Sequence, residues 1–241
     1  MRLRLSFRDT PCLRVELQPT GPARAGALAG SSAEWYEREM GLRDRLRGRL
    51  LDWVMRQMNE LRPEVLEGVR GDVLEVGFGT GLNLDFYPPG VSSLVGLDPS
   101  IASGLPALEE RMARAPFPVE RCDLRADGEL PFDAGRFDCV VTTWTLCSIP
   151  EPLRALAQMR RVLKPGGRYV FIEHGRGAAT LARWQDRINP LWRRISGGCN
   201  LNRPIDQLVA EGGFELEGLD RFRHTGPALL AQMYRGVARS G

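Results

Sequence analysis

From Gly71 onward, short runs rich in β-branched residues alternate with longer helical stretches, and this alternation constrains the fold more than any other feature. Five runs are predicted as strands: DVLEVG (72–77), SSLVGLD (92–98), PVERCDL (118–124), FDCVVTTW (137–144) and RYVFIEH (168–174). The clearest helix between them is EPLRALAQMRRVLK (151–164), which a following PGG turn closes. Strands that alternate with helices pair in parallel through right-handed crossovers. The sequence therefore predicts an α/β fold with a doubly wound, Rossmann-like sheet.

The predicted domain organisation has three parts. Residues 1–30 alternate apolar and charged side chains and then become rich in Gly, Ala and Pro, which is typical of a hairpin followed by a flexible connector. Apolar residues at steps of three and four indicate a helical cap over residues 31–70. Residues 71–241 form the main domain. Its last part is predicted as a helix in RPIDQLVAEGGF and as two strands in FELEGLDRF and AQMYRGVAR.

Composition disfavours several classes of partner. The 33 basic residues nearly balance the 30 acidic ones, so there is no strong attraction to nucleic acid. No apolar run approaches the roughly 18 residues that cross a bilayer, which leaves only contact with a membrane surface open. Five cysteines without a CxxC pair argue against a disulfide framework and against a zinc site, so no metal is predicted. We expect a cytoplasmic protein, and the sequence carries no signal for an oligomeric state.

The first predicted strand is followed by three glycines at alternate positions, Gly77, Gly79 and Gly81. Glycine permits positive φ and lets a ligand approach the backbone, and the helix expected next offers free N–H groups. Ligands of doubly wound sheets bind at such carboxyl ends of strands. The second strand ends at Asp98, which lies 98 − 81 = 17 residues past the last glycine and can accept hydrogen bonds from ribose hydroxyls. These features together favour a nucleoside ligand.

Two nucleoside cofactors use such a loop, namely dinucleotides and S-adenosylmethionine. The dinucleotide fingerprint is GxGxxG, and here its third glycine position holds Leu82 while the third glycine comes one residue early. The spacing therefore favours S-adenosylmethionine. A nicotinamide-dependent oxidoreductase stays as the alternative from another enzyme class.

Four motifs together carry a family resemblance: VLEVGFGTG, LDPS, FDCVVTTWTLCSI and MRRVLKPGGRYVFIEH resemble those of class I S-adenosylmethionine-dependent methyltransferases of the small-molecule type. The resemblance covers about residues 71–240 and implies a seven-stranded sheet with the last strand antiparallel. It also implies the cofactor contacts. The methionine moiety would meet Glu75 and the three glycines, the ribose Asp98, the adenine Pro99, Asp123 and the N–H of Leu124, and the methyl group Thr143 and Trp144.

Four further runs are similar to a narrower branch, the methyltransferase-like proteins that include thiol S-methyltransferases: NLDFYPPG (83–90), TLCSIPE (145–151), FIEHGRG (171–177) and WQDRINPLWRRISGGCNLNR (184–203). This similarity implies a small, apolar acceptor, with a thiol as the first hypothesis. A thiol has a pKa of about 8.5 and needs only modest help to become a thiolate. The alternatives are N- or O-methylation of a lipid, quinone or other metabolite, and a non-catalytic module that binds S-adenosylmethionine.

The candidate general base is His174, at the end of the fifth predicted strand. Its other reading is a side chain that only bonds the neighbouring loop. Cys147 and Cys199 are interpreted first as packing residues, because buried cysteine behaves as a small apolar side chain, and second as residues that touch the acceptor. Trp184 and Trp192 recur at helical spacing and are interpreted first as packing residues and second as the roof of an apolar pocket.

Overall fold

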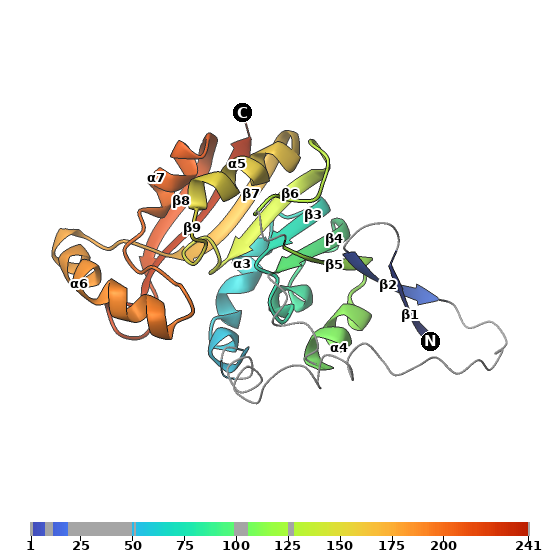
Figure 1. The fold of residues 1–241 in the computed structure, drawn as a ribbon, viewed down its shortest axis with the longest axis horizontal. Helices are drawn as coiled ribbons and strands as arrows, with labels where there is room; N and C mark the ends of the chain where they lie inside the picture. Colours follow the sequence, from blue (N-terminus) through green and yellow to red (C-terminus); the bar gives the residue numbers. More distant parts are fainter. Residues whose placement is uncertain are drawn as a thin grey trace.

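A nine-stranded mixed sheet forms the centre of the molecule (Figure 1). A computed structural model describes residues 2–7, 12–18, 50, 52–98, 106–124 and 128–240, with backbone alone for residues 2–7 and 12–18. The strand order is β1-β2-β5-β4-β3-β6-β7-β9-β8. The strands are β1 (Arg2–Phe7), β2 (Cys12–Gln18), β3 (Gly71–Val76), β4 (Val91–Asp98), β5 (Val119–Asp123), β6 (Phe137–Thr143), β7 (Leu163–His174), β8 (Phe214–Arg223) and β9 (Gln232–Ser240).

The seven strands from β5 to β8 confirm the predicted class of fold. β3 to β7 pair in parallel, and the last strand, β9, lies antiparallel between β7 and β8. Parallel strands need crossover segments, which the chain supplies between successive strands. The strand order reverses at β3, so the loops that follow β3 and β6 diverge there and leave a place for a ligand.

The remaining two strands extend this sheet to nine. β1 and β2 pair antiparallel with each other, and β2 also pairs antiparallel with β5, in a register that sets Cys12 opposite Cys122. The sequence predicted a hairpin and a flexible connector in residues 1–30 and did not place the hairpin on the main sheet. It also argued against a disulfide framework, yet Cys122 is disulfide-bonded.

Helices cover both faces of the sheet. They are α3 (Arg62–Leu66), α4 (Pro106–Arg114), α5 (Pro152–Val162), α6 (Ala179–Ile195) and α7 (Ile205–Glu211), with short 3-10 turns η1 (Asn59–Leu61) and η2 (Leu82–Asp85). α5 and α7 share one apolar core with one face of the sheet, whereas α3 and α4 pack on the other (Figure 1). β3 shows the division, because Leu74 enters the first core and its neighbour Val73 the second.

Several boundaries differ from those predicted. α5 ends at Val162, so the PGG turn lies inside β7, and the turn after the glycines is the four-residue η2 rather than a regular helix. Pro63 stands in the first turn of α3, where its missing N–H costs nothing. Residues 31–49 and residue 51 of the predicted helical cap (31–70) lie outside the described residues. Within the described part of the chain, no helix is long and apolar enough to cross a membrane.

Candidate functional site

The three glycines after β3 all have positive φ, with values of 83° at Gly77, 55° at Gly79 and 70° at Gly81. Their surroundings differ. A Cβ at Gly77 would lie 1.9 Å from the hydroxyl of Thr145, and one at Gly81 would lie 2.9 Å from a methyl of Leu108. Among the described residues, a Cβ at Gly79 would meet only the carbonyl oxygen of Gly77, at 3.9 Å. Within this part of the chain, Gly79 is therefore the glycine whose bare backbone no side chain packs against, whereas the other two glycines admit packed side chains.

Asp98, at the end of β4, faces this loop. Its Oδ2 atom accepts a hydrogen bond from the Gly79 amide at 2.9 Å, and burial raises the pKa of its carboxyl. The loop and the carboxylate thus hold each other in place. This contact joins the two features that the sequence singled out for a nucleoside.

Glu75 stands behind the glycine loop rather than in it. Its side chain is buried, and its two oxygens accept hydrogen bonds from Asn83 Nδ2 at 2.9 Å and from the Tyr87 hydroxyl at 2.7 Å. Burial raises the pKa of Glu75 to about 7. Both donors belong to the run NLDFYPPG, so that run supports the loop from within. Each carboxylate oxygen thus already accepts one hydrogen bond from the protein, and the contact of Glu75 with the methionine moiety stays a prediction.

Arg62 extends this buried network to the end of β6. Its guanidinium donates to the Asn83 side-chain oxygen and lies 5.0 Å above the ring of Trp144, and desolvation lowers its pKa to about 10. Asn83 Nδ2 also donates to Thr143 Oγ1 at 3.1 Å. One side chain thus connects the start of α3 with the glycine loop and with β6.

Trp144 is the residue of the described chain, glycines aside, that adopts a positive φ, at 53°. Its indole is buried, and its Nε1 atom has no hydrogen-bond partner in the part of the chain that the structure describes. A buried orphan donor costs roughly 1–3 kcal/mol, and a left-handed conformation costs about as much. A strained backbone with an orphan donor makes Trp144 a candidate functional position. The contact of Thr143 and Trp144 with a ligand stays a prediction.

The predicted adenine side is less well matched. Asp123 pairs with Asp98 in the β4–β5 register, and its Oδ1 accepts a hydrogen bond from Arg121 at 3.0 Å. The Leu124 N–H donates to the Asp98 carbonyl oxygen at 3.0 Å, so the sheet already uses the donor that was predicted for the adenine ring. Pro99 lies outside the described residues.

A second group of side chains gathers at the ends of β6 and β7. Cys147, His174 and Cys199 place one sulfur or nitrogen atom each within 4.8 Å of one another. The two sulfurs are 3.6 Å apart, and Cys199 Sγ lies 3.9 Å from His174 Nδ1. The contact between the thiols, with burial, raises the pKa of Cys147, whereas that contact lowers the pKa of Cys199. We call these three residues the sulfur–histidine cluster.

Glu173 fixes the loop that carries Cys147. This carboxylate is fully buried and accepts backbone hydrogen bonds from Thr145 at 3.1 Å, Leu146 at 2.9 Å and Cys147 at 3.1 Å. Burial raises its pKa. Sequence reasoning missed this role, although a glutamate inside an otherwise apolar strand is the signal that would have found it.

The segment after α6 closes the cluster from the other side. Asn200 donates to the Cys147 carbonyl oxygen from both its backbone N–H and its side-chain amide, each at 2.9 Å. Asn189, on α6, donates to the Asn200 side chain at 3.2 Å. Trp192 packs on the cluster, but Trp184 is 55% exposed, so the two indoles do not share one buried face as predicted.

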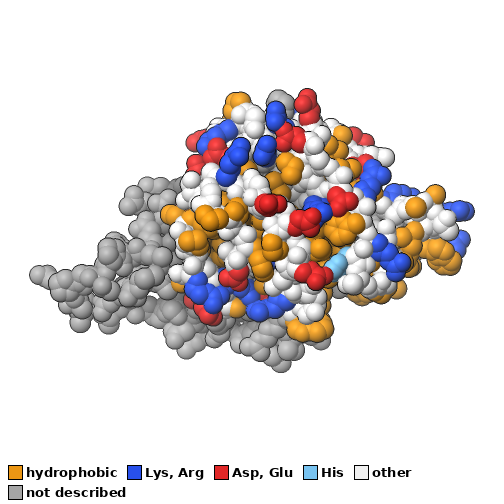
Figure 2. Space-filling view, turned by 180° about the vertical axis from the view of Figure 1, so that it is seen from behind, with side chains coloured by type: hydrophobic (Ala, Val, Ile, Leu, Met, Phe, Trp, Pro, Cys, Tyr) orange, Lys and Arg blue, Asp and Glu red, His pale blue; other side chains and the backbone are white. Residues whose placement is uncertain are grey.

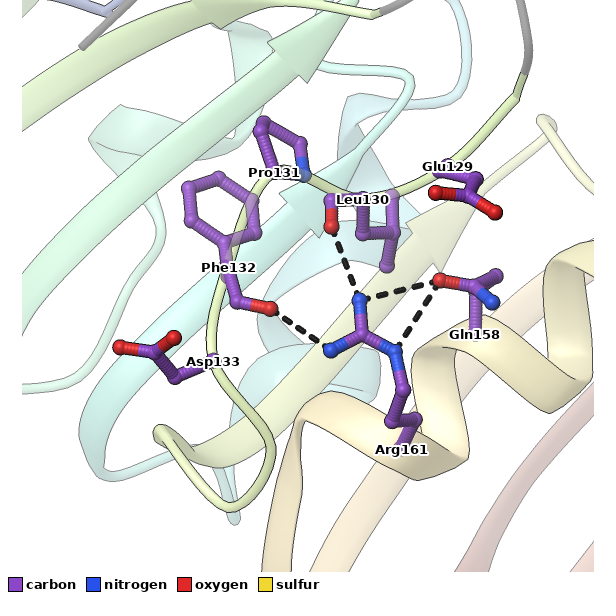
Figure 3. A pocket seen from close by; sticks show the side chains of 7 residues that line it. All are labelled: Glu129, Leu130, Pro131, Phe132, Asp133, Gln158 and Arg161. Atoms are coloured by element: carbon purple, nitrogen blue, oxygen red, sulfur yellow. Dashed lines mark hydrogen bonds between the residues drawn. The ribbon is translucent and has the colours of Figure 1, made fainter.

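A hollow elsewhere on the molecule takes no part in this site. Figure 3 shows it between the segment before β6 and helix α5, with Arg161 reaching across. That guanidinium donates to the carbonyl oxygens of Phe132 and Leu130 at 2.7 and 2.8 Å and to the Gln158 side chain. Its hydrogen bonds tie the loop to the helix, and none of the lining residues is a predicted site residue.

Comparisons with known proteins agree with this geometry. Residues 74–171 match the family described as a methyltransferase domain. The chain is 38% identical over 152 residues to the human thiol S-methyltransferase TMT1B, a match that covers 57% of this chain and 58% of the relative. It is 36% identical over 107 residues to a phosphatidylethanolamine N-methyltransferase of Cereibacter sphaeroides, covering 43% and 51%. The chain thus spans less than two thirds of the length of these relatives.

Solved structures extend the comparison to the fold alone. A geranyl diphosphate methyltransferase in complex with S-adenosylmethionine has a TM-score of 0.56 at 14% identity, covering 77% of this chain and 85% of the other. The [4+2]-cyclase SpnF has a TM-score of 0.58 at 19% identity, covering 76% and 79%. Because a cyclase shares the architecture, the chemistry must be argued from the side chains.

Proposed function

We propose that this chain, a member of the class I S-adenosylmethionine-dependent methyltransferases, transfers a methyl group from that cofactor to a small apolar acceptor, and that the acceptor atom is a thiol sulfur. The observation that carries the proposal is the contact between the two halves of the site. The Gly77 position lies against Thr145, and Thr145 stands two residues before Cys147 in the loop that Glu173 holds. The glycine loop and the sulfur–histidine cluster are therefore joined through the segment from Thr145 to Cys147.

The glycine loop, Asp98 and the end of β6, which we call the cofactor half, fit S-adenosylmethionine. The open space at Gly79 admits a ligand against the backbone, and Asp98 offers a carboxylate beside it for ribose hydroxyls. The unpartnered indole N–H of Trp144 supplies a donor at the end of β6. When bound, this cofactor supplies an electrophilic methyl group. The residues of the chain bind and orient it and keep water away from the acceptor.

The acceptor half suits a soft nucleophile. His174 is half-buried at the end of β7 and is proposed to take the proton from the acceptor thiol. Cys147, Cys199 and Trp192 give its surroundings an apolar character. The relatives named thiol S-methyltransferases support this choice of acceptor.

A second candidate is N- or O-methylation of an amphiphilic acceptor such as a lipid or quinone. It is favoured by α6, which leaves Trp184, Leu191 and Ile195 at least half exposed beside the acceptor half. Figure 2 shows apolar and arginine side chains together at the end of the molecule where α6 lies. The relative that methylates phosphatidylethanolamine supports the same candidate.

Calorimetric titration tests the cofactor. S-adenosylmethionine and S-adenosylhomocysteine are expected to bind and NADH is not, and tight binding of NADH alone would contradict the proposal. Asp98→Ala is expected to weaken cofactor binding by about 1–3 kcal/mol through loss of charge-assisted hydrogen bonds. Asp133→Ala, which removes an exposed carboxylate elsewhere, is the matched control.

A screen of methyl transfer to alkyl thiols, amines, phenols and lipids tests the acceptor. Activity confined to nitrogen or oxygen acceptors would remove the thiol and leave the second candidate. His174→Ala should lower turnover with thiols most at neutral pH and least at a pH where the acceptor is already ionised. Unchanged turnover across that range would exclude His174 as the base.

A further inference from the structure

We propose that Cys147, His174 and Cys199 form a binding site for one zinc ion, with a fourth coordination position open to the sulfur of a thiol. The assignment of the fourth ligand rests on the proposed function, whereas the three protein ligands do not depend on it. The sequence spacing argued against zinc because it has no CxxC pair. The fold brings the three ligands together from a loop after β6, the end of β7 and a loop after α6.

The distances match those that a tetrahedral zinc site requires. Bond lengths of about 2.3 Å to sulfur and about 2.0 Å to nitrogen place two sulfur ligands about 3.8 Å apart and a sulfur and a nitrogen about 3.6 Å apart. The observed separations are 3.6 Å for the two sulfurs and 3.9 Å for Cys199 Sγ and His174 Nδ1. All three atoms lie within 4.8 Å of one another, so the Cys147 sulfur and the His174 ring nitrogen need to approach by at most about 1.2 Å to reach the tetrahedral separation.

The surroundings hold the ligands as a metal site needs. Glu173 fixes the backbone of Cys147 through that residue's N–H, and Asn200 fixes it through the carbonyl oxygen with two hydrogen bonds. Asn189 in turn fixes Asn200. The backbone on both sides of Cys147 and the residue after Cys199 are thus held by buried polar side chains. Such outer partners set the orientation of metal ligands.

The ligand set indicates the metal and its use. Two thiolates and one imidazole are soft to borderline ligands that suit zinc rather than magnesium or calcium. Three protein ligands are typical of zinc sites that keep an exchangeable position, whereas structural sites have four. Cys147 is 1% and Cys199 8% exposed, and His174 is half-buried, so the open position is reached past the histidine. A thiol that binds there loses its proton to solvent and stays as a zinc-bound thiolate, so that no redox partner is needed. With zinc bound, the metal replaces His174 in activating the thiol, and His174 acts as base only in the metal-free chain.

The experiment titrates the reduced, metal-free full chain with Zn²⁺ and with Co²⁺ in the absence of oxygen. We expect one ion per chain, and with Co²⁺ the intense visible bands of tetrahedral coordination and the near-ultraviolet bands of thiolate ligation. Cys147→Ser, Cys199→Ser and His174→Ala should each weaken Zn²⁺ binding by about 100-fold. Cys139→Ser, which alters another buried free cysteine, should leave it unchanged.

Two outcomes would overturn the proposal: no stoichiometric binding to the reduced protein, or binding that survives in the Cys147→Ser, Cys199→Ser double variant. Circular dichroism melts identify a variant that has merely unfolded, and Cys147→Ala then serves as the second substitution. Addition of a small alkyl thiol should shift the Co²⁺ spectrum, and a spectrum that does not respond would refute the open position. S-adenosylhomocysteine binding is measured on the same samples. If the chain binds the cofactor and fails to bind zinc, only the zinc inference is refuted. If it binds zinc and fails to methylate thiols, only the proposed function is refuted.

Discussion

The glycine loop and the sulfur–histidine cluster lie side by side, but the chain builds them in different ways. Glu75, the three glycines, Asn83, Tyr87 and Asp98 all fall within residues 75–98, so most of the cofactor half comes from one short stretch, to which β6 adds Thr143 and Trp144. The cluster takes its three members from positions 147, 174 and 199, which only the folded sheet brings together. A local motif can be read from spacing, whereas a site assembled from distant segments needs the topology.

The two halves also treat buried carboxylates differently. Glu75 is bonded to side chains, so its neighbours Asn83 and Tyr87 can change with it. Glu173 is bonded to three backbone N–H groups, which no substitution of the donors can alter. The cofactor half is therefore expected to respond to substitution of the donor side chains, whereas the loop of the acceptor half should respond mainly to loss of Glu173 itself.

The largest effect is expected for Gly77→Ala. Its Cβ would stand 1.9 Å from the Thr145 hydroxyl at a φ of 83°, so overpacking and backbone strain together should cost about 4 kcal/mol of unfolding free energy. Urea denaturation measures it. Gly79→Ala is the matched control, since it meets open space and should cost only about 1 kcal/mol while weakening cofactor binding. Equal stability losses for the two variants would contradict the different roles given to these glycines.

Glu173→Ala should cost about 3 kcal/mol, because it leaves three buried N–H groups without an acceptor. Binding of S-adenosylhomocysteine should persist wherever the variant is folded, whereas the thiols of Cys147 and Cys199 should become reactive toward a thiol reagent. Glu173→Gln, which keeps the shape and one acceptor oxygen, should show a smaller effect. If the variant lost cofactor binding while the two thiols stayed unreactive, Glu173 would support the glycine loop and not the loop that carries Cys147.

Stability should depend on pH through Glu75. Its folded pKa of about 7 exceeds the ordinary value of 4.5, so between these values the folded state holds a proton that the unfolded state has lost. Stability from this group is therefore full below about pH 4.5 and falls by up to about 3 kcal/mol as the pH rises to about 7. Thermal melts measured across this pH window should show a weaker dependence of the melting temperature on pH in Glu75→Gln, but not in Asp133→Asn. An unchanged pH dependence in Glu75→Gln would exclude Glu75 as its source.

The smallest effect is expected for Asn200→Ala, at about 1–2 kcal/mol, because the backbone N–H of that residue still donates to the Cys147 carbonyl oxygen. Thermal melts measure the loss. Asn202→Ala removes a side-chain hydrogen bond to exposed Asp186 nearby and should change stability by less than about 0.5 kcal/mol. A larger loss of stability in Asn202→Ala than in Asn200→Ala would argue against the role of Asn200 in holding the Cys147 backbone.

Apolar periodicity and glycine turns are local signals, and they predicted the parallel sheet. The antiparallel last strand was implied by the family resemblance. The sequence also placed Asp98 and Trp144 at strand ends from these local signals. It assigned the alternate glycines to ligand approach, but the partner of Gly77 is Thr145, which follows a different strand and is invisible to spacing. The N–H of Leu124 was misassigned because the ladder that consumes it depends on strand register.

The contact of the hairpin with β5 and the meeting of Cys147 with Cys199 depend likewise on tertiary pairing. Residue type alone flagged both cysteines and His174 as candidates. Their distances could not be predicted, because no periodicity links position 147 with position 199. The two buried glutamates were detectable as charges in apolar strands, and in both the direction of the carboxylate was set by donors from other segments.

Trp144 carries a consequence for how this protein would respond to selection. A glycine there would adopt the same backbone without strain and would remove an unsatisfied donor, so Trp144→Gly has a gain in thermal stability to set against the loss of packing that the indole provides. Truncation of a buried indole costs about 3–5 kcal/mol, which is comparable to the strain and the donor penalty that it relieves. Selection for heat resistance alone would therefore be nearly neutral at position 144, and retention of the tryptophan under selection for turnover would follow from its proposed contact with the ligand.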